Sequence, residues 1–433
     1  MNKKFLLIFV LLLVKKISTA QTISLEEACM MAINNNFSIQ AAQNNAQIAK
    51  TNNFLGNTGK LPRINLLIND NYQIFGINQV LASGQEISRK GAASNALGAT
   101  IRADWQVFNG FRIPATQERL ILQELNSQLA LKAQKQALVA SVIIAYADIV
   151  RQKQNVKVLK SSLEVSEKRM EIIRKRIEVG TANQTDLYLA ELDINTQQQA
   201  LANQYLAIKQ ATINLNILIG KKAEEQTEVS ENISFEENIS IEELRNALQN
   251  NPQLEIVKNN LKIGKNLEKE SNAQRLPTLN LNAGYSYNRN NSTAGFLLLN
   301  QNYGAFIGFN FTLPLYNGNI SSRQFEVTKL QTKAQEIEIQ RVKQELEGEL
   351  ERQWQAYLLA KEQLQAEEKN AKVAQEYLVL MQKRFELGQS NIIEIREAQR
   401  VLESTEGRRT QAIFNLKVAE TQVLLVAGKL NKY

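Results

Sequence analysis

Few side chains in this chain are of the types that carry out chemistry. Histidine is absent from the 433 residues, and Cys29 is the one cysteine. The composition therefore excludes a histidine base, a Ser-His-Asp triad, an internal disulfide and the usual histidine or cysteine zinc site. The run Gly220-Lys221-Lys222 has the pattern of a helix end and not of a phosphate-binding loop. We expect a protein that is not an enzyme and that has no cofactor and no metal site.

Two carboxylates are the strongest candidates for binding ions. Glu394 and Glu397 lie six and nine residues after Gly388, which places them one helical turn apart on one face of a helix. Carboxylates gathered around a narrow axis would favour cations and would raise one another's pKa by repulsion. The alternative is that both are ordinary solvated glutamates, of which the chain has many.

The charge of the chain does not indicate a nucleic-acid partner. The formal net charge is +8, from 51 Lys and Arg residues and 43 Asp and Glu residues. The two signs are interspersed, and no cluster combines basic with aromatic residues.

The first 20 residues have the pattern of an export signal. Lys3 and Lys4 precede an apolar run from Phe5 to Val14, and Ser18-Thr19-Ala20 offers a cleavage site. Such a run is too short to span a bilayer, which needs about 20 residues. We expect residues 1–20 to be a signal peptide. The alternative is an uncleaved N-terminal anchor.

The remainder of the chain consists of two similar halves, expected at 21–220 and 221–433. Several short segments recur in the same order: Ser24 to Glu27 as Ser240 to Glu243, Leu61-Pro62 as Leu276-Pro277, Phe108 to Gly110 as Tyr316 to Gly318, and Arg176 to Gly180 as Arg384 to Gly388. The offset falls from 216 to 208 along the chain, so the first half contains a longer connecting segment.

Each half contains two segments in which apolar residues alternate with polar ones, as in strands. They lie at about 64–76, 98–108, 278–287 and 304–313. The length and alternation are typical of membrane barrel strands, but they fit half-buried strands of a soluble sandwich equally well. In a barrel the polar face would line the lumen with Arg102, Asp104, Gln106, Asn280 and Asn282. We expect the connectors, about 76–97 and 288–302, to be external loops.

Four long helices are expected at about 113–179, 183–219, 320–386 and 391–427. The first has no glycine and no proline after Pro114; its 67 residues would span about 100 Å. Apolar residues recur every seven positions in the second, as in left-handed coiled coils: Leu187, Ile194, Leu201, Ile208 and Leu215. Four positions after Leu187 and Ile395, and onward by sevens, small and polar side chains are common.

Four strands cannot close a barrel, because the smallest barrels need about eight. Open strand edges would also invite aggregation. A symmetric oligomer removes both difficulties, and a trimer would combine twelve strands with twelve helical segments around one axis.

The motifs occur in the same order in both halves, and this repeated order resembles that of the TolC family of outer-membrane efflux proteins. The resemblance rests on the Leu-Pro before the first strand of each half, the Phe/Tyr-Asn-Gly after the second strand, and the Arg-x-x-x-Gly break between the long helices. It covers nearly all of the chain beyond residue 20. Pro314 stands two residues before Tyr316, as the family often has it, and the one departure is Gln106 at the equivalent position of the first half.

The resemblance implies a mainly α-helical protein with a membrane β-barrel. Three copies would form a 12-stranded barrel in the outer membrane of a diderm bacterium, continued by a helical tunnel in the periplasm. A periplasmic adaptor (a membrane fusion protein) and an inner-membrane pump of the RND or ABC type would be the partners. The chain would be a passive exit duct, and its sequence does not encode the cargo.

The resemblance also implies an adaptor-docking site at the two helix-helix breaks. The residues that match are Arg176, Gly180, Leu187, Arg384, Gly388 and Ile395. The glycines permit the chain to reverse, and the arginines lie in a last helical turn where the helix dipole favours cations. Helix capping alone would also explain these residues.

A second implied site is the constriction of the tunnel, formed by Glu394 and Glu397 with Asp186 and Phe385. In the family this gate is often clasped by a tyrosine that bonds an aspartate, and by an arginine. Phe385 replaces the tyrosine and Ser390 the arginine. A closed state of this chain would therefore depend on other contacts.

Two other classes of protein fit parts of the pattern. A secreted structural or adhesive coiled-coil protein would have the long helices but no need of two amphipathic hairpins. A periplasmic adaptor would have one helical hairpin among domains rich in short strands and glycines, whereas this sequence predicts two hairpins.

Overall fold

The computed structural model describes residues 22–236 and 239–430, so the expected signal peptide, 1–20, lies outside the described residues. The chain forms two compact units. We call one the sheet unit, Asn45–Gln128 and Ile256–Gln340, and the other the helical unit, Met1–Asn44, Leu129–Glu255 and Arg341–Tyr433.

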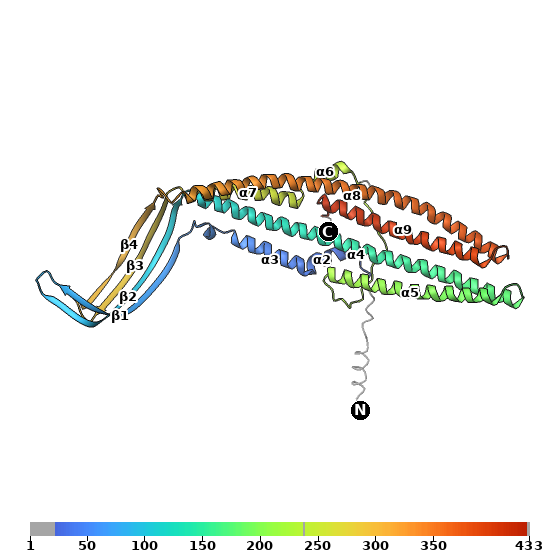
Figure 1. Cartoon of the computed structure of the whole chain (residues 1–433), viewed down its shortest axis with the longest axis horizontal. Coiled ribbons are helices and arrows are strands. Elements are labelled where there is room, and N and C mark those ends of the chain that lie inside the picture. Colours follow the sequence, from blue (N-terminus) through green and yellow to red (C-terminus); the bar gives the residue numbers. More distant parts are fainter. Residues whose placement is uncertain (1–21, 237–238, 431–433) are drawn as a thin grey trace, which may run out of the picture. The chain divides into compact units, whose positions relative to one another are not determined.

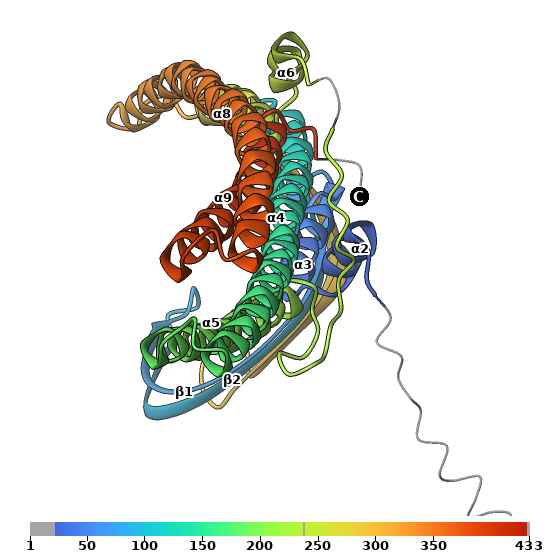
Figure 2. The same ribbon diagram turned by 90° about the vertical axis from the view of Figure 1, so that its right-hand side faces the viewer.

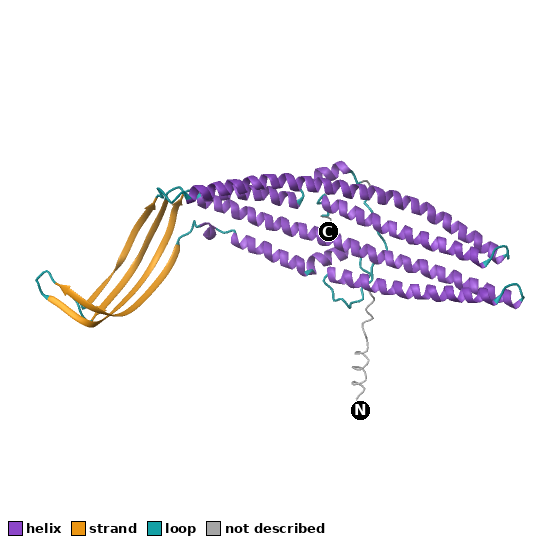
Figure 3. Ribbon diagram, viewed as in Figure 1, coloured by secondary structure: helices purple, strands orange, loops and turns teal. Residues whose placement is uncertain are grey.

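The sheet unit contains one antiparallel sheet of four strands in the order β1-β2-β3-β4 (Figures 1 and 3). The strands are β1 (Arg63–Val80), β2 (Glu86–Asn109), β3 (Thr278–Ser292) and β4 (Leu299–Thr312). The strands predicted from the alternation are thus present, two from each half. Among the described strands, β1 and β4 each pair with one neighbour only, so both edges of the sheet are open.

The hairpins are longer than the alternation indicated. Most of the expected loop 76–97 is paired strand: Ile77 lies opposite Arg89 and Val80 opposite Glu86. The turn is short, and Leu81 N–H donates to the Gln85 carbonyl at 2.8 Å. The expectation of long external loops was wrong because backbone pairing continues where apolar and polar side chains are mixed on both faces, and such residues show no alternation.

The largest elements of the chain are four long helices. They are α4 (Arg112–Glu178) and α8 (Ile320–Glu386), with 67 residues each, and α5 (Gln184–Leu218) and α9 (Ile392–Val426), with 35 residues each. The shorter helices are α2 (Leu25–Asn35), α3 (Phe37–Asn52), the 3-10 helix η1 (Leu55–Thr58), α6 (Ile241–Leu248) and α7 (Pro252–Ala273). The equal lengths follow from the duplication.

In the helical unit the long helices form one layer in the order α5-α4-α9-α8 (Figures 1 and 2). Hydrogen bonds join neighbours in this order: Gln204 of α5 with Gln152 of α4, and Gln399 of α9 with the Ser162 carbonyl of α4 at 2.9 Å. An apolar cluster that includes Met381 and Ala398 joins α8 to α9.

The core of the helical unit lies along α4. Its middle carries a run of buried apolar residues: Val139, Val142, Ile143, Tyr146, Ile149 and Val150. The Tyr146 hydroxyl is within hydrogen-bond distance of the carbonyls of Ile23 and Ser230, at 3.0 and 2.9 Å. Of the described helices, α4 alone has an apolar stretch long enough to cross a membrane, and 56% of that stretch is buried in the molecule, as in the core helix of a soluble protein.

Candidate functional site

The two helical hairpins end in tips with the same backbone geometry. Gly180 and Gly388 both have φ of 75°. The amide after each glycine bonds back to the arginine carbonyl, Thr181 to Arg176 and Gln389 to Arg384, both at 2.8 Å. This is the Schellman ending of a helix, which favours glycine at the position with positive φ.

Each following helix begins with a capping box. Asn183 accepts from the Asp186 amide at 3.0 Å, and Asn391 accepts from the Glu394 amide at 2.9 Å. The carboxylates of Asp186 and Glu394 accept in return from the amides of the asparagines. Two predicted gate residues therefore have equivalent local roles in helix initiation.

Phe385 is the centre of the contact between the tips. The Arg176 guanidinium lies 4.4 Å from the centre of its ring and donates to its carbonyl. The ring is 2% exposed in an apolar cluster with Ile173, Ala190 and Ile392. Loss of the tyrosine hydroxyl is thus accompanied by an apolar and cation–π contact that joins the two hairpins.

Four of the predicted docking residues lie in the turns of the tips, and two pack inward. Ile395 is 3% exposed in the Phe385 cluster, and Leu187 packs against it. The apolar side chains that the tips expose are Val179, Leu387 and Ile393, at 72%, 71% and 66%. Sequence reasoning missed these three, although Val179 and Leu387 directly precede the tip glycines.

The carboxylates of Glu394 and Glu397 are both engaged within the chain. Glu397 accepts two hydrogen bonds from Arg400, at 2.9 and 2.6 Å. The bond from Arg400 lowers the pKa of Glu397, opposite to the direction expected for carboxylates that only repel one another. The neighbouring arginine therefore offsets the negative charge at this position.

A buried polar network, which the sequence analysis missed, joins α4, α5 and α9 near the tips. Arg169, whose side chain is 1% exposed, bonds Asp193 at 2.6 Å, and Arg396 bonds the same carboxylate at 2.8 Å. Arg169 also donates to Gln399, at 3.1 Å, and Gln399 donates to the Ser162 carbonyl. The signal was available, because Gln399 is one of the polar residues four positions after the apolar heptad of its helix.

Glu403 is the partly buried acid of this network. Ser162 and Gln197 donate to its carboxylate, the latter at 3.2 Å. Burial raises its pKa, while the bonds from Gln399 and Gln197 oppose the shift.

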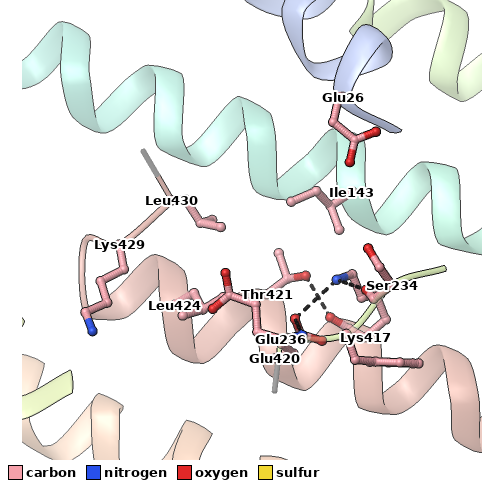
Figure 4. A pocket seen from close by; sticks show the side chains of 11 residues that line it. Glu26, Ile143, Ser234, Glu236, Lys417, Glu420, Thr421, Leu424, Lys429 and Leu430 are labelled. Atoms are coloured by element: carbon pink, nitrogen blue, oxygen red, sulfur yellow. Dashed lines mark hydrogen bonds and ion pairs between the residues drawn. The ribbon is translucent and has the colours of Figure 1, made fainter. Parts of the chain in front are cut away.

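A second buried pair lies in a cavity of about 410 Å³ in the helical unit (Figure 4). Lys417 donates to the Ser234 carbonyl at 2.8 Å and to Glu420 at 3.2 Å. Glu420 also accepts from the Glu236 amide at 2.9 Å, and burial raises its pKa. The pair fastens the segment that connects the two halves onto α9.

The sheet unit brings together all five predicted lumen residues. The strand register places Asp104 opposite Asn282 and Gln106 opposite Asn280, with Arg102 on the same face. These side chains line a hollow of about 460 Å³, and Arg102 pairs with Asp104 at 2.8 Å. This face of the sheet is therefore mostly polar, although Leu67 and Phe306 also lie on it.

The opposite face is apolar and exposed. It carries Ile64, Leu66, Ile68, Ile101 and Ile307, with exposures from 51% to 76%. Aromatic residues lie at both ends of this band: Trp105, Phe309 and Phe311 at one end, and Tyr287 and Tyr303 at the other, in the row of Ile68, while Tyr285 lies opposite Ile101 within the band. An apolar band between two aromatic girdles is the pattern of a lipid-facing surface.

Comparison with known proteins places the chain in a family. The model of the family described as "Outer membrane efflux protein" matches residues 29–221 and 244–429. The chain belongs to the outer membrane efflux protein family. The resemblance to the TolC family is thereby confirmed, and the protein is an outer-membrane channel.

Individual relatives are distant in sequence and close in fold. The outer membrane efflux protein BepC of Brucella suis biovar 1 (strain 1330) is 22% identical over 334 residues, which cover 76% of this chain and 72% of BepC. The CmeC outer membrane channel of Campylobacter jejuni has a TM-score of 0.78 at 15% identity, covering 94% of this chain and 85% of CmeC. For the outer membrane protein VceC of Vibrio cholerae the TM-score is 0.77 at 14% identity, covering 93% of this chain and 96% of VceC.

Proposed function

We propose that the chain is the outer-membrane duct of a tripartite efflux or type I secretion system. Residues 1–20 direct its export, and the two repeats, 21–220 and 221–433, each supply one β-hairpin and one helical hairpin. Three copies form a 12-stranded barrel continued by a periplasmic helical tunnel. The duct performs no reaction and needs no cofactor.

The observation that carries this proposal is the two-faced sheet with two open edges. An apolar band between aromatic girdles suits lipid, and the polar face opposite suits a water-filled lumen. The open edges of β1 and β4 would expose unpaired backbone groups in a membrane, at several kcal/mol for each group. Pairing of β4 with β1 of the next copy removes this cost, and three copies exceed the minimum of about eight strands.

Partners are expected at the tips. A periplasmic adaptor would contact the turns at Arg176, Gly180, Arg384 and Gly388 and the exposed Val179, Leu387 and Ile393. An inner-membrane pump, of the RND or ABC type, would deliver the cargo through that adaptor.

Single-channel conductance in a planar bilayer tests the duct and its constriction. The wild type is compared with Glu394→Gln/Glu397→Gln and with Glu242→Gln, which removes an exposed charge from α6 as a control. Glutamine retains the capping box of α9, so the double variant removes charge without loosening the helix. We expect a small cation-selective conductance that loses its selectivity only in the double variant.

Two other results would contradict parts of the proposal. An unchanged selectivity in the double variant would keep the duct and reject Glu394 and Glu397 as its constriction. A protein that neither conducts nor forms a detergent-stable trimer would reject the duct and favour a secreted coiled-coil protein without a pore.

A further inference from the structure

The cavity around Lys417 and Glu420 has the size of a ligand site. Its volume is about 410 Å³, and it lies entirely within the helical unit. Pockets for small molecules span roughly 300–1,000 Å³. Four parts of the chain line this cavity: the start of α2, the middle of α4, the segment that connects the two halves, and α9 with the residues after it (Figure 4). The proposed duct makes no use of it.

The charges around the cavity favour a cation. Three carboxylates and two ammonium groups line it: Glu26, Glu236, Glu420, Lys417 and Lys429. Lys429 pairs at 3.2 Å with Glu243, which is not part of the lining. The lining therefore has an excess of negative charge, which is complementary to a positively charged ligand.

The buried carboxylate of Glu420 is only partly satisfied. Its Oε1 accepts from the Lys417 ammonium at 3.2 Å and from the Glu236 amide at 2.9 Å. Its Oε2 has no hydrogen-bond partner among the described residues, although Glu420 is 1% exposed. A buried acceptor without a donor destabilises the fold, so a donor from a ligand would be stabilising here.

The first half of the chain shows that the fold does not require this carboxylate. The offset of 208 maps Lys417 onto Lys209 and Glu420 onto Thr212 of α5. The Thr212 hydroxyl donates within its own helix, to the Ile208 carbonyl at 2.9 Å. The buried acid is therefore specific to the second half, where it lines the cavity.

We propose that this cavity binds a small organic cation, with an ammonium group on a short apolar body. The ammonium donates to the Glu420 carboxylate and faces Glu26 across the cavity (Figure 4). The apolar body packs against Ile143, Leu424 and Leu430. Because the ligand contacts several parts of the chain at once, its binding stabilises the helical unit.

Isothermal titration calorimetry of the purified full-length protein tests the site. The probe is phenethylamine, which carries its ammonium on a phenylethyl group. One control ligand is 2-phenylethanol, which has the same body without the charge. The other is sodium chloride at the same concentration, which supplies a cation without the apolar body.

Three variants locate the binding. Glu420→Gln removes the charge and keeps the shape of the side chain. Glu362→Gln removes an exposed carboxylate from α8 and is the matched control. Leu424→Phe narrows the cavity and leaves Glu420 in place, so the test does not depend on the folding of one variant. Circular dichroism checks that each variant is folded.

We expect phenethylamine to bind equally to the wild type and to Glu362→Gln. Binding to Glu420→Gln should be weaker by about tenfold or more, the loss that follows removal of a hydrogen bond to a charged group. Leu424→Phe should also weaken binding, and neither control ligand should bind.

Two results would overturn this inference. No binding of phenethylamine to the wild type would show that the cavity holds water only. Binding that is equal in the wild type, Glu420→Gln and Leu424→Phe would place the ligand elsewhere. If Glu420→Gln does not fold, Leu424→Phe decides alone. Conductance is not part of this test, so either result would leave the duct intact.

Discussion

At the scale of the residue, polar groups buried between helices are the main finding. Arg169, Asp193 and Arg396 form a chain of charges in which one carboxylate serves two guanidinium groups. Neither arginine occupies the arginine position of the family gate, where this chain has Ser390. These ion pairs lie further from the tips than the gate residues that the sequence predicted.

Asp193→Asn should destabilise the helical unit strongly. Removal of one partner leaves Arg169 buried without its counter-charge, at a cost of about 3–5 kcal/mol. Thermal unfolding measures the loss. Glu171→Gln, which breaks the exposed pair of Glu171 with Lys175, is the control and should leave the midpoint unchanged. Equal unfolding midpoints for the two variants would show that the buried ion pair contributes no more to stability than the exposed one.

The partly buried carboxyl of Glu403 predicts a stability that depends on pH. Because burial raises the pKa of Glu403, the folded chain holds the proton more tightly than the unfolded chain, and the ionised carboxyl destabilises the fold at neutral pH. This penalty is removed as the pH falls through the folded pKa. Glu403→Gln should therefore raise the unfolding midpoint at pH 8, and the gain should shrink as the pH falls towards 4.5, the ordinary pKa of a glutamate.

Glu397→Gln is the matched comparison, because Arg400 lowers the pKa of Glu397. Its contribution to stability is present at neutral pH and is lost in acid, so this variant should show the opposite sign. A gain for Glu403→Gln that does not change with pH would refute the assignment of the shift to burial.

At the scale of the element, the sequence was sufficient where turn chemistry is explicit. The two tips follow from Gly180 and Gly388 and from the asparagines that cap the next helices. The extension of β1 and β2 to Val80 and Glu86 could not be predicted, because residues exposed on both faces carry no periodic signal. The inward packing of Leu187 and Ile395 depends on Phe385, which lies on another helix.

The tip glycine predicts an asymmetry between two similar substitutions. Gly388→Ala should cost about 1–2 kcal/mol, because a side chain is disfavoured at φ of 75° although its Cβ would meet nothing closer than 4.0 Å. Gly348→Ala, in the interior of α8, should instead stabilise the helix by about 0.5–1 kcal/mol. Amide hydrogen exchange at the tip measures the first change and thermal unfolding the second. Equal effects of both variants would contradict this account.

At the scale of the whole molecule, the sequence predicted the class of protein better than its contacts. The duplicated order of motifs was enough to identify the family, because each motif is weak but their sequence is specific. The network around Arg169 could not be predicted from the sequence, because its members are spread over three helices and each resembles a polar residue of the surface.

The membrane-facing band predicts the effect of a charge on insertion. Ile307 is 76% exposed on the apolar face, and Ile307→Arg should cost about 2–4 kcal/mol if it lies near the bilayer midplane. Asn310→Arg, three residues along β4 on the polar face, should cost much less. Urea titration of the protein in lipid vesicles measures both. A larger loss for Asn310→Arg would place the lipid on the other face.

The two arginines of the tips make different contacts. Arg384 donates within its own turn, to the Gln389 carbonyl, whereas Arg176 reaches across to the backbone of the other hairpin. This contact therefore couples the two tips, so that a displacement of one is transmitted to the other. A molecule that displaces one tip also has to break or move the contacts of Arg176 and Phe385 that join it to the other.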